Sequence, residues 1–129
     1  MRAAWAVLAV LGAGAAVLPG CTKEISQGPT IRDGAAYYAQ PRAKGTIACE
    51  AGRPVVIEGD RSALRLTGPC HHVTVAGRRN DLHVEMAPSG VIEITGARND
   101  VTWRQVGEGP APELKAVGPN TDFHRDRAG

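Results

Sequence analysis

Residues 73–84, VTVAGRRNDLHV, decide the fold, because the same pattern occurs three more times along the chain. The other copies are VVIEGDRSALRL at 55–66, IEITGARNDVTW at 92–103 and LKAVGPNTDFHR at 114–125. Each copy has apolar residues four and two before a glycine, an Asn, Ser or Thr three after it, and apolar residues five and seven after it, except at Arg125. The glycines stand 18, 19 and 22 residues apart, so the chain contains a two-part repeat.

The alternation around each glycine is typical of short β-strands, whose side chains point to opposite faces in turn. One copy cannot bury its own apolar side chains, but parallel stacking of copies forms a continuous core. We therefore predict an all-β domain over residues 46–125, a small parallel β-solenoid of about four two-strand coils of 18–19 residues. We expect the glycines to adopt positive φ at bends. We expect the Asn, Ser and Thr side chains to bond to turn backbone or to one another.

An antiparallel β-sandwich is the alternative, because short strands at regular spacing also suit that fold. The two folds differ in strand pairing. A solenoid pairs Val75 in parallel with Ile57 and Ile94, whereas a hairpin pairs Val75 with Leu82 across the bend.

Cys49 and Cys70 occupy nearly equivalent places in consecutive repeats. Neighbouring strands lie ~4.8 Å apart, and a disulfide needs Cα atoms ~4.4–6.8 Å apart. We predict a disulfide that joins the first two coils. Two free thiols, or a metal-binding pair, are the alternatives, and no close C-x-x-C spacing favours the metal.

Residues 1–20 resemble a bacterial lipoprotein signal peptide. Arg2 supplies a positive charge, and residues 3–17 form an apolar stretch too short for a comfortable membrane span. Leu-Pro-Gly-Cys then resembles a lipobox that ends at Cys21, although Pro19 departs from the usual small residue. We predict that Cys21 carries lipid and that the mature chain is an exported protein anchored to a membrane.

This resemblance also implies a location. In a diderm host, Thr22 is not the Asp of an inner-membrane retention signal, which implies the periplasmic side of the outer membrane. In a monoderm host, the expected place is the outer face of the plasma membrane. We interpret residues 21–45 as the lipidated cysteine and a flexible spacer, with Tyr37–Tyr38 in an N-terminal cap or a partner contact. Residues 126–129 are interpreted as a tail.

The charge of the chain is close to balanced. The formal net charge is +2, and removal of residues 1–20 takes away Arg2 and no acid. No Lys/Arg run is longer than Arg78–Arg79, and aromatic residues make up 4% of the chain. This composition lacks the basic patch and stacking residues of a nucleic-acid-binding protein, so we expect no nucleic-acid partner.

The run from Cys49 to Trp103 resembles the bacterial family known as domain of unknown function 3060, through its Gly-x-x-Asn-x-Val-like repeats and its cysteine pair. The sequence departs from that pattern at Ser62, at Thr121 and at the charged pair Arg78–Arg79. The resemblance implies a β-solenoid-like module of the cell envelope. It supplies no catalytic residues.

Polar residues that alternate with the core positions form the candidate contact face. We expect one flat strand surface lined by Glu58, Arg65, Thr74, His83, Glu85, Glu93, Thr102 and Arg104. Such repeat surfaces suit extended partners, either a polysaccharide or a peptide. Alternation with Val101 places Trp103 in the core or an end cap, and sugar stacking is the alternative for this residue.

Metal sites and catalytic groups have weaker signals. His71, His72 and His83 could hold a metal loosely, but no carboxylate–histidine spacing accompanies them, and His124 has no evident companion. Asp60, Asp81 and Asp100 fall in turns, where turn chemistry is favoured over calcium binding. The serines at 26, 62 and 89 lack a G-x-S-x-G context.

We therefore expect a non-catalytic binding or structural module of the envelope, without a cofactor or a metal. Its partner would be an envelope protein or a polysaccharide. A small-ligand-binding envelope lipoprotein is the alternative function, and an envelope enzyme is the least favoured.

Overall fold

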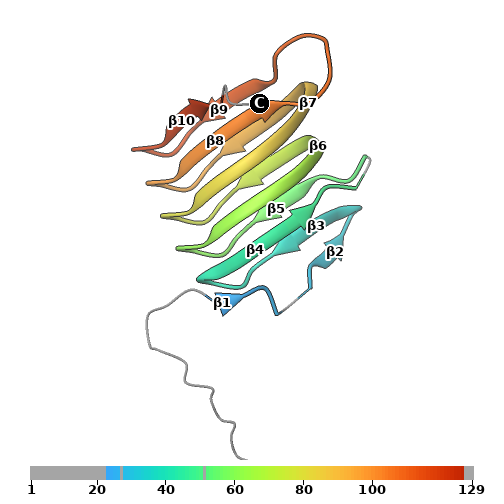
Figure 1. Cartoon of the computed structure of the whole chain (residues 1–129). Helices are drawn as coiled ribbons and strands as arrows, with labels where there is room; N and C mark the ends of the chain where they lie inside the picture. Colours follow the sequence, from blue (N-terminus) through green and yellow to red (C-terminus); the bar gives the residue numbers. More distant parts are fainter. Residues whose placement is uncertain (1–22, 27, 51, 127–129) are drawn as a thin grey trace, which may run out of the picture.

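The computed structural model describes residues 23–26, 28–50 and 52–126, and these residues form ten strands and no helix (Figure 1). The strands are β1 (Lys23–Glu24), β2 (Thr30–Arg32), β3 (Ala35–Tyr38), β4 (Ala43–Ala48), β5 (Val55–Ile57), β6 (Ala63–Val75), β7 (Asp81–Ile94), β8 (Asp100–Gln105), β9 (Glu113–Ala116) and β10 (Asp122–Arg125). The predicted signal segment, Cys21 and residues 127–129 lie outside the described part. Within that part, no helix could cross a membrane.

The chain winds into a flattened coil with two strand layers, and this confirms the predicted parallel β-solenoid. Face A contains β1, β4, the first half of β6, the first half of β7, β8 and β10, all parallel. Face B contains β3, β5, the second halves of β6 and β7, and β9, also parallel, with β2 antiparallel to β3 at its end. The long strands β6 and β7 pass through both faces (Figure 1).

Strand pairing excludes the sandwich alternative. Val75 pairs in parallel with Ile57 on one side and Ile94 on the other. A hairpin would instead have placed Val75 antiparallel to the strand that directly follows it. The pairs join equivalent positions of successive repeats because only this register keeps every apolar side chain on the inner side of its strand.

The core is a set of stacked apolar columns between the two faces. One column on face A runs through Ile47, Leu66, Val84 and Trp103, and Trp103 is buried, at 7% exposure. The same column ends at Arg125, whose guanidinium lies 5.2 Å from the centre of the Trp103 ring. A cation therefore ends the apolar column at the last strand.

The corner that leads from face B to face A carries Gly59, Gly77, Gly96 and Gly118, and we call it the glycine corner. The expectation of positive φ at these glycines is wrong. They are required because the coils stack too closely for a side chain. A Cβ atom on Gly77 would lie 2.0 Å from the carbonyl oxygen of Gly59, and one on Gly96 would lie 1.8 Å from that of Gly77.

A buried polar ladder stands next to these glycines. The hydroxyl oxygen of Ser62 accepts the backbone N–H of Ala43 at 3.0 Å. The amide oxygen of Asn80 accepts the N–H of Ser62 at 2.8 Å, and that of Asn99 accepts the N–H of Asn80 at 2.9 Å. The side chains thus bond to the backbone of the preceding coil rather than to one another. Each bond pairs a donor that would otherwise be buried alone.

The solenoid is longer at its N-terminus than expected. In the described residues, the first coil contains β1 and β3, and the second contains β4 and β5. The long strands β6 and β7 each form one coil, β8 and β9 form the fifth, and β10 starts another. The interpretation of residues 21–45 as a flexible spacer is therefore wrong from Lys23 onward. Small residues fill these first core positions, since Ala35, Ala36 and Ala43 are buried, and small residues give a weak periodic signal.

A hairpin ends face B at the N-terminal side. Asp33 and Gly34 both adopt positive φ, of 52° and 81°, which suits a tight two-residue turn between β2 and β3. Arg32 lies over the ring of Tyr37, 3.8 Å from its centre, and Tyr38 packs against the core. This geometry agrees with the cap interpretation of the two tyrosines.

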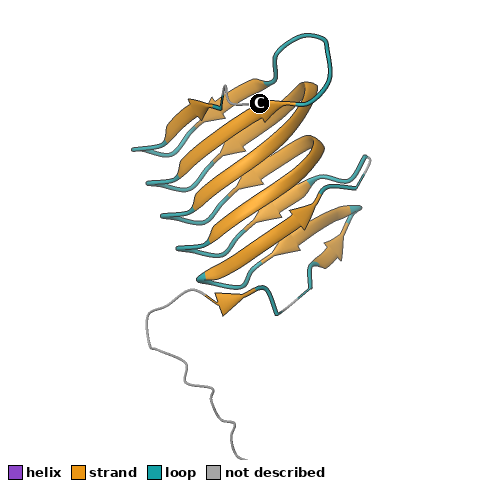
Figure 2. Cartoon of the chain, viewed as in Figure 1, coloured by secondary structure: helices purple, strands orange, loops and turns teal. Residues whose placement is uncertain are grey.

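The second corner, which leads from face A to face B, differs from coil to coil, and we call it the variable corner (Figure 2). Here Cys49 and Cys70 form the predicted disulfide, with Cα atoms 5.3 Å apart. The bond joins the second coil to the third. The predicted disulfide is therefore confirmed, and its coils are numbered one higher than predicted because the solenoid has an additional coil at its N-terminus.

Candidate binding face

The expected single contact surface is divided between the two faces. Arg65, His83 and Thr102 are neighbours on face A, whereas Thr74 and Glu93 are neighbours on face B. The set is divided because every coil has two strands on opposite sides of the core. Outward residues of the two strands therefore point in opposite directions. Glu85 and Arg104 belong to face A, and Glu58 lies just beyond β5, on the side of face B.

The residues on face A form ordered rows across parallel strands. One row runs from Thr46 through Arg65, His83 and Thr102 to His124. Adjacent strands lie ~4.8 Å apart. A polar group of a ligand that contacts one side chain of the row can therefore also reach the side chains on the neighbouring strands.

Two adjoining hollows lie on this face. The first, of about 170 Å³, is lined by Arg65, His83, Val84, Glu85, Thr102, Trp103, Arg104 and Asp126. The second, of about 300 Å³, is lined by Lys44, Gly45, Thr46, Ala63, Leu64, Arg65, Asp81 and His83. Arg65 and His83 line both hollows, so the two hollows are adjacent on face A, and we treat them together as one shallow groove. We call it the face A groove.

A fixed charge pair lines the groove. Glu85 accepts the backbone N–H of Gly68 at 3.0 Å and forms an ion pair with Arg104. The hydrogen bond from Gly68 is the main cause that holds the pKa of Glu85 below its ordinary value, followed by the bond from Arg104. The side chains of Glu85 and Arg104 are 25% and 41% exposed. They are therefore held in place while still reachable by a ligand.

Histidines and aspartates on face A form further contacts. His83 lies 3.9 Å from Asp81. His124, which has no companion in the sequence, lies 3.2 Å from Asp100. The pairing was not evident from the sequence because β8 and β10 are neighbours only through stacking of the coils.

The histidines considered for metal binding do not converge. His72 pairs with Val91 on face B, whereas His83 lies on face A, so the core separates them. Asp81 and Asp100 are aligned in register, but Asp60 is not aligned with them and instead accepts the N–H of Arg78 at 2.8 Å. The described residues contain no group of three or more His, Cys, Asp or Glu that could hold a metal ion.

Lys44, Thr46 and Asp126 are groove residues that the sequence did not reveal. Lys44 falls in the segment interpreted as a spacer, and Asp126 in the segment interpreted as a tail, whereas Thr46 lies at the start of the predicted β domain but was not among the expected contact residues. The segment Ala43-x-Gly45-x-Ile47 does keep the alternation of the later strands. It was hidden because its first two inward positions are occupied by small residues.

The arrangement suits recognition of a polar chain. The groove presents guanidinium and ammonium donors, carboxylate acceptors, and side chains such as Thr102 and His83 that can do both. It is shallow and runs across several strands, so a ligand would meet a repeated set of polar groups.

Comparison with known proteins gives a match to one family. Residues 57–120 match the family model described as "Protein of unknown function (DUF3060)". The matched part runs from the end of β5 to the glycine corner after β9 and supports the family resemblance of the repeats. Comparison with curated proteins and with solved structures found no match.

Proposed function

We propose that this protein is a lipid-anchored, non-catalytic binding module of the bacterial cell envelope, and that the face A groove contacts its partner. The partner is an extended polar chain, either a polysaccharide or a peptide. The observation that carries the proposal is the pair of adjacent hollows on face A, both of which are lined by Arg65 and His83.

The groove is rigid enough to bind without large reordering. Backbone hydrogen bonds between parallel strands hold each coil, and the bonds from Gly68 and Arg104 hold the Glu85 carboxylate. Because little conformational entropy is lost in ordering such a surface, more of the contact energy remains for affinity. Extended repeat surfaces are commonly used in this way for long ligands.

The groove assignment can be tested by site-specific photocrosslinking in intact envelope. A photoreactive residue at Thr102 on face A should yield a crosslinked partner. The matched control is Thr74 on face B, which is also partly buried and also faces outward. Equal crosslinking from both positions, or crosslinking from Thr74 alone, would contradict the assignment.

The lipid anchor is supported by the lipobox-like residues 18–21 and by the position of β1. Lys23 already belongs to the sheet and pairs with Ala43, and Cys21 precedes it by two residues. The anchor would therefore hold the first coil close to the membrane, without an intervening spacer. Replacement of Cys21 by Ser should move the protein from the membrane fraction to the soluble fraction. Retention in the membrane pellet would contradict lipidation.

A further inference from the structure

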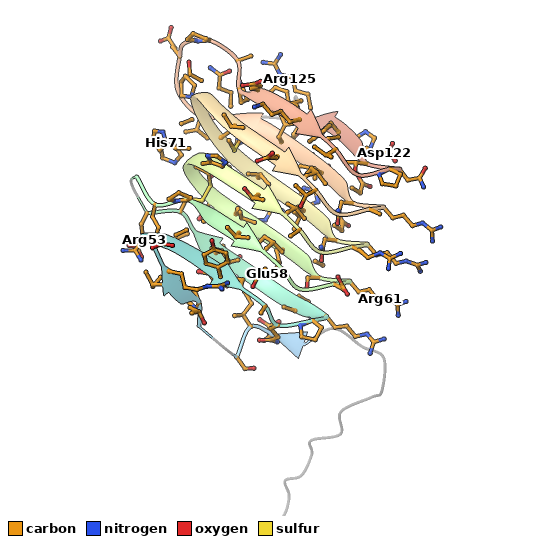
Figure 3. All side chains as sticks on the ribbon, turned by 180° about the vertical axis from the view of Figure 1, so that it is seen from behind. Arg53, Glu58, Arg61, His71, Asp122 and Arg125 are labelled. Atoms are coloured by element: carbon orange, nitrogen blue, oxygen red, sulfur yellow. A yellow bond between two sulfur atoms is a disulfide. The ribbon has the colours of Figure 1, made fainter. Side chains whose placement is uncertain are left out.

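A row of exposed arginines runs along the glycine corner. Arg42, Arg61, Arg79 and Arg98 occupy the same place in four successive coils, and all four side chains are exposed. Their backbone N–H groups donate to carbonyl oxygens of the next coil at 2.7–3.1 Å, so neighbours stand ~4.8 Å apart. Figure 3 shows Arg61 pointing away from the body, with more nitrogen-ended side chains along the same edge. We call these four residues the arginine ridge.

The ridge arginines lack the partners that several other arginines of the described residues have. Arg32 pairs with Glu58, Arg53 with Glu50 and Arg104 with Glu85, while Arg125 lies over Trp103. Within the described residues, no ridge guanidinium forms an ion pair, a hydrogen bond or a ring contact. In the part of the chain that the structure describes, these four exposed cations outnumber the one carboxylate beside them at this corner, that of Asp60, so the edge carries a net positive charge.

The ridge arginines have a left-handed backbone conformation, which arginine rarely adopts. The four residues have φ of 53°, 57°, 58° and 61°, in the left-handed region that favours Gly and Asn over other side chains. The next coil has Asn120 at the equivalent place, with φ of 60°. The fold therefore accepts Asn here, yet the other four coils carry Arg, which is less suited to this backbone. Such outliers point to a function for the side chain.

The ridge lies at the edge where the chain enters the fold. Lys23 pairs with Ala43, the residue after Arg42. Cys21 is only two positions before Lys23 in the sequence, and two residues span at most ~7 Å, so the chain length would keep a lipid anchor on Cys21 near the start of the ridge. We infer that the arginine ridge docks onto the phosphate headgroups of the membrane that holds the lipid anchor, so that the solenoid axis lies along the membrane surface. This inference rests on the proposed lipidation of Cys21.

Arginine suits this partner, because its planar guanidinium binds phosphate oxygens through two hydrogen bonds. A basic patch also adds to a lipid anchor at an anionic surface. A planar surface fits the ridge better than a polyanion that wraps around the corner. Asp81 and Asp100 stand two residues beyond Arg79 and Arg98, and they align with Asp122 in an acidic row on face A. A wrapping polyanion would meet these carboxylates.

The test uses the acylated protein purified from membranes and reconstituted in vesicles. A dye on Pro119→Cys reports the far end of the glycine corner, and a dye on Glu113→Cys reports face B of the same coil. Vesicles of phosphatidylcholine, with or without about one part in three of phosphatidylglycerol, carry a headgroup quencher. We expect quenching at position 119 only with phosphatidylglycerol, and little quenching at position 113 in either vesicle.

The ridge variant combines Arg61→Asn, Arg79→Asn and Arg98→Asn. It should lower the docking constant on the order of 100-fold, about fivefold per arginine, and its melting temperature should not fall, because Asn suits this backbone. The matched control removes three charges elsewhere, through Arg32→Gln, Arg53→Gln and Lys115→Gln. It should dock as the parent does.

Three results would overturn the inference: equal quenching at position 119 in both vesicles, no change in the ridge variant, or an equal loss in the control. A ridge variant that docks normally on vesicles but no longer binds soluble polyphosphate would assign the ridge to a free polyanion instead. The mass of the purified protein tests the anchor separately. If Cys21 is unacylated, the anchor proposal fails, and flotation of that protein with the same vesicles still tests the ridge.

Discussion

At the glycine corner every coil spans the same length, whereas at the variable corner the length changes from coil to coil. At the glycine corner, the inward positions before and after the bend are seven positions apart in the sequence, as are Val75 and Leu82, and Ile94 and Val101. At the variable corner, the spacing between the inward positions before and after the bend changes from coil to coil. The pairs are Ile47 and Val55, Leu66 and Val73, Val84 and Ile92, and Trp103 and Leu114. Figure 2 shows the regular loops on one edge and the larger loops on the other.

The two corners are stabilised by different means. The glycine corner repeats one device, in which a glycine lets the backbones approach and an Asn or Ser pairs the buried N–H of the coil before. The variable corner uses single devices, namely the Cys49–Cys70 disulfide and the bond from Gly68 to Glu85. A glycine of the repeated device must fit the backbone of its neighbours, so we expect the glycines to be the positions that are most costly to change.

The largest effect should come from Gly96→Ala. The added Cβ would lie 1.8 Å from the carbonyl oxygen of Gly77, and backbone on both sides has to move. We expect a loss of about 3 kcal/mol or more in the free energy of unfolding, seen in urea denaturation or as insoluble protein. Gly28→Ala is the matched control, because nothing lies within 4 Å of its added Cβ. If Gly96→Ala is as stable as Gly28→Ala, the proposed role of close stacking is wrong.

The next largest effect should follow removal of the disulfide. Replacement of both Cys49 and Cys70 by Ala opens a crosslink over 21 residues of sequence separation, which should cost about 3 kcal/mol. The measurement is thermal or urea unfolding of the oxidised protein and of the variant. Reduction of the parent protein should give a similar loss. A variant as stable as the oxidised parent would show that the first coils do not need this bond.

A smaller effect is expected at the polar ladder. Asn99→Ala removes the acceptor for the N–H of Asn80 and the donor to the carbonyl of Gly77. Because both groups are buried, the cost should be about 2 kcal/mol in urea denaturation. Asn99→Ser should lose less, since Ser62 performs the acceptor role in its own coil. Equal losses for Ala and Ser would mean that the side-chain oxygen is not what stabilises this position.

The smallest effect should come from Glu85→Gln at the variable corner. At neutral pH it should cost below about 1 kcal/mol, as for other partly exposed ion pairs. The pKa of Glu85 is lowered in the folded protein, so its contribution is fully present above the unfolded pKa of about 4.3. It is lost as the pH falls through the lower folded pKa.

Acid unfolding titrations should therefore show that the parent is more stable than Glu85→Gln at neutral pH and that this difference shrinks in acid. Glu93→Gln on face B is the control. Its carboxylate has no ion pair or hydrogen bond among the described residues. If the difference between the parent and Glu85→Gln stays constant into strong acid, the proposed role of the charge is wrong.

Most of the middle of the fold could be predicted from the sequence. The apolar pairs around Gly77 and Gly96 recur with two-residue alternation, and stacking of the copies is the simplest way to bury them. The disulfide followed from the same alignment, because Cys49 and Cys70 fall near one corner of consecutive coils. The N-terminal coils were missed because Gln40 stands where later coils have glycine and because alanines replace larger core residues.

The binding face could be predicted only in part. Alternation correctly placed Arg65, His83 and Thr102 on an outer surface. It could not show that Thr74 and Glu93 face the opposite way. The two-residue alternation shows only which side chains of a strand point into the core and which point to solvent. Which face of the solenoid the outward side chains belong to depends on how the corners turn the chain.

The repeat, the inward side of each strand and the cysteine pair can all be predicted from the sequence. These follow from local alternation and spacing, which a linear chain displays directly. Only the stacked coils reveal which outward residues share a face, that two hollows are adjacent on face A, and that four arginines form one row. These features depend on contacts between residues about 19 positions apart, which arise only when one coil stacks on the next.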